Sequence, residues 1–80
     1  MKNDNSKGRI AATEYFEADG KYTAAIEYVS KEKMYEIVEY VNSNPYSREV
    51  ISRTQSITDA YRMMGAHVTT AICMNHASFE

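Results

Sequence analysis

The chain has 80 residues, 44% of them hydrophobic and 25% charged, and its formal net charge at pH 7 is −2. This composition is typical of an ordinary globular protein, and the length suffices for one domain with a small core. No apolar run approaches the ~20 residues of a membrane-spanning helix, and the first residues lack the apolar segment of a signal peptide, so we expect a cytoplasmic protein with no membrane contact.

The two ends of the chain are polar. Residues 1–8 contain nothing that could be buried against a core, and we expect them to form a flexible tail. The last residues, 76–80, are predicted to be a second short tail. The sequence therefore predicts a single domain over residues 9–75.

Asp19-Gly20 lies between two runs rich in strand-forming residues and predicts an N-terminal β-hairpin. A turn at this pair places Phe16 opposite Thr23 and Glu14 opposite Ala25. The sequence leaves open which of the two faces of the hairpin is buried, although the face that carries Glu14 and Glu27 is the better candidate for exposure to solvent. The first face carries Ala11, Thr13, Tyr15, Tyr22, Ala24, Ile26 and Tyr28, and the second carries Ile10, Ala12, Glu14, Phe16, Ala25, Glu27 and Val29.

Residues 29–45 combine a start signal, a periodicity and a stop signal for a helix. Ser30 is a favourable N-cap, and Pro45 disfavours helical geometry at the residue before it. We therefore expect a central amphipathic helix over about residues 31–43. Its apolar stripe has the spacing i, i+3, i+4, i+7 and consists of Met34, Ile37, Val38 and Val41.

After Pro45 two interpretations are possible. Residues 48–54 are rich in β-branched side chains and favour a strand, after which Ser56 and Asp59 resemble a capping box that opens a second helix ending near residue 64, before Gly65. The alternative is one helix over residues 48–64. Residues 67–74 alternate between two sets of side chains, which predicts a C-terminal strand. The expected fold is α+β, with the order ββαβαβ or, in the alternative, ββααβ.

Few residues favour catalysis or metal binding. Cys73 and His76 have a C-x-x-H spacing, but a structural zinc site usually needs two such pairs, and His67 is the only other histidine. The three glycines are isolated, so no phosphate-binding loop is expected. We predict no catalytic residue, no metal and no cofactor.

The predicted central helix would carry an acidic ridge opposite its apolar stripe. Its carboxylates would recur about every turn, at ~5–6 Å, which is close to the separation of successive phosphates along a nucleic-acid strand. Such a ridge could occupy a basic groove that normally holds nucleic acid, with two tyrosines as anchors. The predicted partner-binding residues are Glu32, Tyr35, Glu36, Glu39 and Tyr40.

A second hypothesis is a small dimeric DNA-binding transcriptional regulator that uses Arg48, Arg53 and Arg62. Residues 10–44 contain seven acidic and only three basic side chains, which disfavours direct nucleic-acid binding. In size, acidity, tyrosine content and lack of catalytic residues, the chain resembles the small proteins with which phages and other mobile elements block host machinery, anti-CRISPR proteins among them. This resemblance covers no aligned motif. It implies a non-enzymatic inhibitor of a larger host protein or ribonucleoprotein complex, with a homodimer also compatible.

Overall fold

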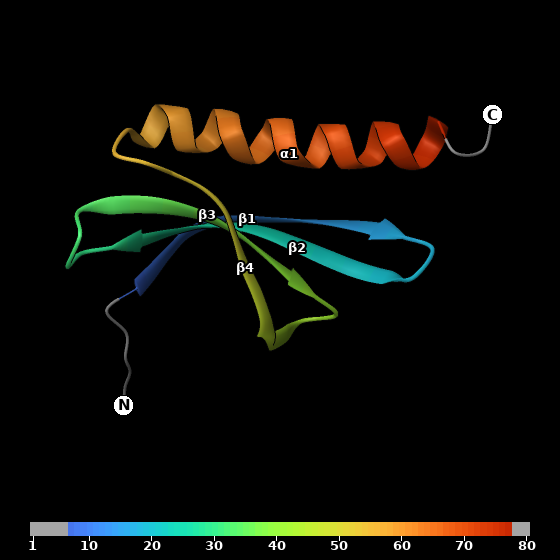
Figure 1. The fold of residues 1–80 in the computed structure, drawn as a ribbon, viewed down its shortest axis with the longest axis horizontal. Helices are drawn as coiled ribbons and strands as arrows, with labels where there is room; N and C mark the ends of the chain where they lie inside the picture. The colour runs from blue at the N-terminus through green and yellow to red at the C-terminus, as the bar shows by residue number, and fades with distance from the viewer. Residues whose placement is uncertain (1–6, 78–80) are drawn as a thin grey trace.

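The computed structural model describes residues 7–77, and the side chains of residues 8–74, as a four-stranded antiparallel sheet followed by one helix. The strands β1 (Lys7–Glu17), β2 (Gly20–Val29), β3 (Met34–Val41) and β4 (Asn44–Thr54) lie in the order β1-β2-β3-β4, and helix α1 spans Ile57–Ala77. In Figure 1, α1 lies over one face of the sheet, while the turn between β3 and β4 points away from it.

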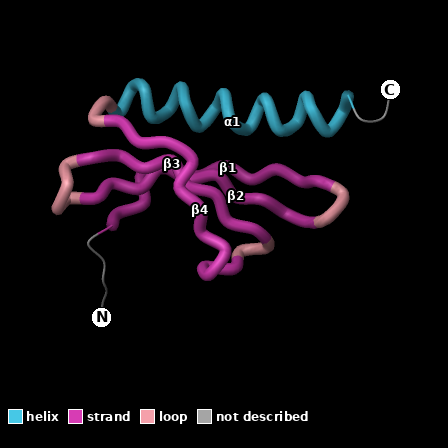
Figure 2. The backbone as a smooth tube through the Cα atoms, viewed as in Figure 1, coloured by secondary structure: helices cyan, strands magenta, loops and turns pink. Residues whose placement is uncertain are grey.

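The order ββββα shows that both predicted arrangements, ββαβαβ and ββααβ, are wrong. Figure 2 shows strand from residue 7 to residue 54, interrupted only by short turns, and a single C-terminal helix. Residues 1–6 of the predicted N-terminal tail and residues 78–80 of the predicted C-terminal tail lie outside the described residues.

The predicted N-terminal hairpin is present, but its register differs by two residues. Phe16 pairs with Lys21 and Glu14 pairs with Thr23, because the loop consists of Ala18-Asp19 rather than Asp19-Gly20. Gly20 then begins β2 at a φ of +149°, a backbone conformation that residues other than glycine rarely adopt. A shift of two leaves the side chains from Ala11 onward on their predicted faces, since strand side chains alternate, whereas Ile10 lies in the irregularity between Arg9 and Ala11.

The predicted helix over residues 31–43 is wrong: residues 30–33 form a turn and Met34–Val41 is strand β3. The middle residues of this strand, Glu36, Ile37 and Val38, are buried although they alternate between the two faces of the sheet. Its apolar residues therefore form a nearly continuous run that also fits a helical stripe. A second turn closes the β3–β4 hairpin, with Asn42 and Ser43 at φ values of 53° and 60°. Two successive positive φ values are typical of a type I′ hairpin turn.

Residues 48–54 are part of β4, which confirms the predicted strand and makes the single helix over residues 48–64 wrong. Ser56 caps α1 as expected, because its Oγ accepts a hydrogen bond of 3.2 Å from the Asp59 N–H. The helix does not end near residue 64, however, and the predicted strand over residues 67–74 is wrong because it belongs to α1. Ala60, Met64 and Val68 recur every four residues and all face the sheet.

The core lies between α1 and the first predicted face of the hairpin. Its buried residues are Ala24, Ile26, Ile37, Ala60 and Met64. No helix among the described residues is long and apolar enough to cross a membrane. No helix in the described part of the chain covers the opposite side of the sheet, which we call the open face. Alternation and register assign to it Ala12, Glu14, Phe16, Thr23, Ala25, Glu27, Glu36, Val38, Tyr40 and Val50.

The two edge strands differ in regularity. Strand β1 has one irregularity in its pairing with β2, between Arg9 and Ala11, and then pairs continuously to Glu17. Strand β4 has two irregularities in its pairing with β3 and carries Pro45 near its start. Bulges and proline interrupt the regular row of backbone groups on an edge strand.

Candidate functional site

The centre of the open face holds a network of ion pairs. The register places Glu27 of β2 opposite Glu36 of β3, and both residues are buried, at 6% and 4% exposure. Arg48 of β4 reaches both carboxylates, with its Nη2 at 2.9 Å from Glu27 Oε1 and 2.6 Å from Glu36 Oε1. Arg53 Nε lies 3.1 Å from Glu36 Oε2. Two carboxylates that would repel each other are thereby held in place.

The Arg48 guanidinium stays charged in this network. Burial disfavours its charged form, but hydrogen bonds to Glu36 and Glu27, together with the charges of both carboxylates, outweigh that effect and hold the pKa of Arg48 above its usual value. Tyr40 completes the network by donating a hydrogen bond of 2.5 Å to Glu27 Oε2. Burial and this hydrogen bond raise the pKa of Tyr40.

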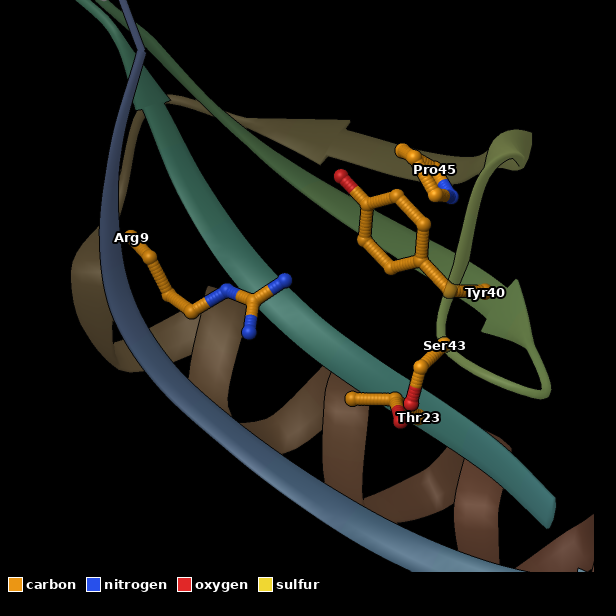
Figure 3. A pocket seen from close by; sticks show the side chains of 5 residues that line it. All are labelled: Arg9, Thr23, Tyr40, Ser43 and Pro45. Atoms are coloured by element: carbon orange, nitrogen blue, oxygen red, sulfur yellow. The ribbon is translucent and has the colours of Figure 1, made fainter.

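Beside the network, the open face is hollowed (Figure 3). The hollow has a volume of about 230 Å³ and is lined by Arg9, Thr23, Tyr40, Ser43 and Pro45. Arg9 comes from β1, Thr23 from β2 and Tyr40 from β3, whereas Ser43 and Pro45 belong to the β3–β4 turn and the start of β4. In Figure 3 the side chains of Arg9, Tyr40 and Ser43 surround the space above Thr23, with α1 behind the sheet.

Three polar side chains that line the hollow, Arg9, Thr23 and Ser43, make no hydrogen bond or ion pair with the described residues, whereas the Tyr40 hydroxyl donates to Glu27. The Arg9 guanidinium lies 5.5 Å from the centre of the Tyr40 ring, a cation–π contact. No carboxylate of the described side chains lies within ion-pair distance of Arg9. Thr23 is only 7% exposed, yet its hydroxyl makes no hydrogen bond within the described part of the chain, and neither does that of Ser43. The hollow therefore combines one positive charge with two unpaired hydroxyls.

A second polar cluster lies on the other face of the sheet, under α1. Glu39 Oε2 accepts a hydrogen bond from the Tyr15 hydroxyl and lies 2.9 Å from His67 Nε2. Burial, followed by the hydrogen bond and charge of Glu39, raises the pKa of Tyr15. Tyr15 stacks on Tyr22, with ring centres 5.4 Å apart. Because Glu39 belongs to β3 and His67 to α1, this cluster joins the helix to the sheet, and the Glu39 side chain is only 13% exposed.

The structure does not bring the five predicted partner-binding residues together. Glu32 is exposed in the turn between β2 and β3, Glu36 is buried on the open face, and Glu39 faces α1. Tyr35 also faces α1, in contact with Tyr28, whereas Tyr40 lines the hollow. Because β3 is a strand, residues three apart point to opposite faces, and no acidic ridge forms.

The three predicted nucleic-acid-binding arginines are also separated. Arg48 and Arg53 are paired with buried carboxylates of the open face, and Arg62 of α1 is paired with Asp59 at 3.1 Å. Cys73 is an exposed free thiol on α1. No three potential ligands among the histidine, cysteine, aspartate and glutamate side chains that the structure describes lie close enough to hold a metal ion.

Comparison with protein-family models, with curated proteins and with solved structures gives no match for this chain. Of the residues that line the hollow in the open face, only Tyr40 is among the predicted partner-binding residues. Arg9 and Thr23 carry no motif, and their proximity follows only from the register of three strands.

Proposed function

We propose that this protein acts by contact, as a non-enzymatic binding protein that presents its open face to an acidic surface of a larger protein. The observation that carries this proposal is the charge pattern of that face. Its acidic side chains Glu14, Glu27 and Glu36 are paired with Lys21, Arg48 and Arg53, whereas Arg9 has no carboxylate partner among the described side chains.

Paired charges make this face suitable for burial against a protein. Side chains that are already hydrogen-bonded lose less hydration when a partner covers them than free charges do. Phe16 at one edge and Val50 at the other are exposed, at 70% and 36%, and offer apolar contacts around the network. The predicted inhibition of a nucleic-acid-handling host complex stays a prediction. The predicted contact, an acidic ridge in a basic groove, is replaced in this proposal by the open face against an acidic surface.

The test is an affinity pull-down from nuclease-treated lysate with four tagged proteins: wild type, Arg9→Glu, Phe16→Asp and Arg62→Glu. The last variant reverses a charge on the exposed side of α1 and serves as the control. We expect the wild type and Arg62→Glu to retain a protein that both open-face variants lose. When that protein is purified, its affinities for the four tagged proteins should follow the same order. Equal retention by all four, or no retained protein, would contradict the proposal.

A further inference from the structure

We propose that the hollow on the open face is a binding site for a single oxyanion group, with Arg9 as its charge partner and the hydroxyls of Thr23 and Ser43 as additional donors. Assigning this group to an acidic side chain of a protein partner rests on the proposed function. The site itself consists only of residues of this chain, so it can be tested without a partner.

Arg9 is positioned before any ligand arrives. Its guanidinium contacts the face of the Tyr40 ring, and this ring is fixed because its hydroxyl donates to Glu27. A guanidinium has five N–H donors, and a cation–π contact leaves them free for an anion. The positive charge is therefore held at the mouth of the hollow with its donors available.

Thr23 marks the floor of the site. The polar groups of a buried residue normally have hydrogen-bond partners, but the hydroxyl of Thr23, a residue that is 7% exposed, has none among the described residues. It lies on the central strand β2, where the pairing with β1 and β3 fixes the backbone. A ligand oxygen in the hollow would provide the missing acceptor.

The lining selects for negative charge. No carboxylate among the described side chains lines the hollow, and the nearby Glu27 is engaged by Arg48 and Tyr40. Ser43 adds a hydroxyl from a turn that is held in place: the Asn42 N–H donates to the Lys21 carbonyl at 2.7 Å, and Asn42 Oδ1 accepts from the Lys21 N–H. A volume of about 230 Å³ accommodates a carboxylate or phosphate group but not a large ligand.

The experiment is a nuclear magnetic resonance titration of the ¹⁵N-labelled full chain with sodium acetate and, separately, with inorganic phosphate, at constant ionic strength set by sodium chloride. We expect saturable shifts of the Arg9 side-chain N–H and of the Thr23 and Ser43 amides. Arg9→Met should weaken binding at least roughly tenfold, because it removes charge-assisted hydrogen bonds. Thr23→Val, which keeps the shape, should weaken it several-fold, and Arg62→Met should have no effect.

Shifts that are absent, that do not saturate, or that persist unchanged in Arg9→Met would overturn the site. Binding of phosphate without acetate would keep the oxyanion site but overturn its assignment to a partner's acidic side chain. Acetate binding together with a failed pull-down would keep the site and overturn the proposed function, so the two proposals fail separately.

Discussion

Arg48 is the residue on which the open face depends most. It pairs with both buried carboxylates, Glu27 and Glu36. We expect Arg48→Met to lower the free energy of unfolding by about 3 kcal/mol, because removing one partner of a buried ion pair leaves charge insufficiently compensated. Urea unfolding followed by circular dichroism measures this change.

Arg62→Met is the matched control, because Arg62 pairs with Asp59 on the exposed side of α1 and its side chain is 74% exposed. An exposed pair of this kind contributes less than about 1 kcal/mol. Equal losses in the two variants would show that the network of the open face adds nothing beyond an ordinary surface ion pair.

Three tyrosines predict instability in alkali. A hydrogen bond to Asp19 raises the pKa of Tyr22 from 10.0 to about 12, and burial raises those of Tyr15 and Tyr40. A phenol whose pKa is higher in the folded than in the unfolded state stabilises the fold fully at pH values below its unfolded-state pKa. This contribution is lost as the pH rises through its folded-state pKa. The free energy of unfolding should therefore fall between pH 10 and about 12.

Tyr22→Phe should reduce this pH dependence, measured as urea unfolding at a series of pH values. Tyr46→Phe is the control, since Tyr46 is 95% exposed and its hydroxyl makes no hydrogen bond with the described residues. If Tyr22→Phe and Tyr46→Phe leave the same slope as the wild type, the hydrogen bond between Tyr22 and Asp19 does not contribute to the alkaline loss.

Among the elements, the hairpins and α1 contain glycines with opposite roles. A Cβ on Gly20 would lie 2.6 Å from Asn42 Oδ1, at a φ of +149°, so we expect Gly20→Ala to destabilise the fold by about 1–3 kcal/mol. A Cβ on Gly65, inside α1, would meet nothing within 4 Å, so Gly65→Ala should stabilise the fold by roughly 0.5–1 kcal/mol. Thermal unfolding of both variants checks the two signs, and equal signs would contradict the assignment.

The element that sequence reasoning missed is β3. The spacing of Met34, Ile37, Val38 and Val41 fits a helical stripe, but aromatic and β-branched residues make up most of Met34–Val41 and favour a strand. Burial on both faces removed the alternation that identifies a strand. The existence of the N-terminal hairpin could be predicted because Asp19-Gly20 is a local turn signal, although the loop proved to be Ala18-Asp19 and the register differed by two residues.

The strand predicted over residues 67–74 was wrong for the opposite reason: its alternation is present in the sequence, but the residues belong to a helix. Residues 67–74 alternate like a strand and contain two adjacent threonines, which disfavour a helix. Packing decides the outcome, since Ala60, Met64 and Val68 continue one stripe onto the sheet. The hollow could not be predicted at all, because Arg9 and Thr23 meet Tyr40 only once β3 is recognised as a strand.

At the scale of the whole molecule, α1 is the only described element that covers the core of the sheet. Ala24, Ile26 and Ile37 are 0% exposed beneath it. We expect a chain that ends after Gln55 to lose the fold, because a sheet with neither face covered by a second layer cannot bury its apolar side chains. The amide spectrum of ¹⁵N-labelled protein distinguishes the outcomes: collapsed dispersion supports the expectation, and a native-like spectrum contradicts it.

The unequal edges of the sheet limit how copies of this protein can join. Among the described strands, a strand added from outside finds a regular row of backbone groups only along residues 11–17 of β1, since β4 is broken by two irregularities and Pro45. Two copies joined through β1 would form one eight-stranded sheet whose outer strands are both β4. Such a pair would have no regular edge left among the described strands, so a contact that joined two copies would also oppose the addition of further copies.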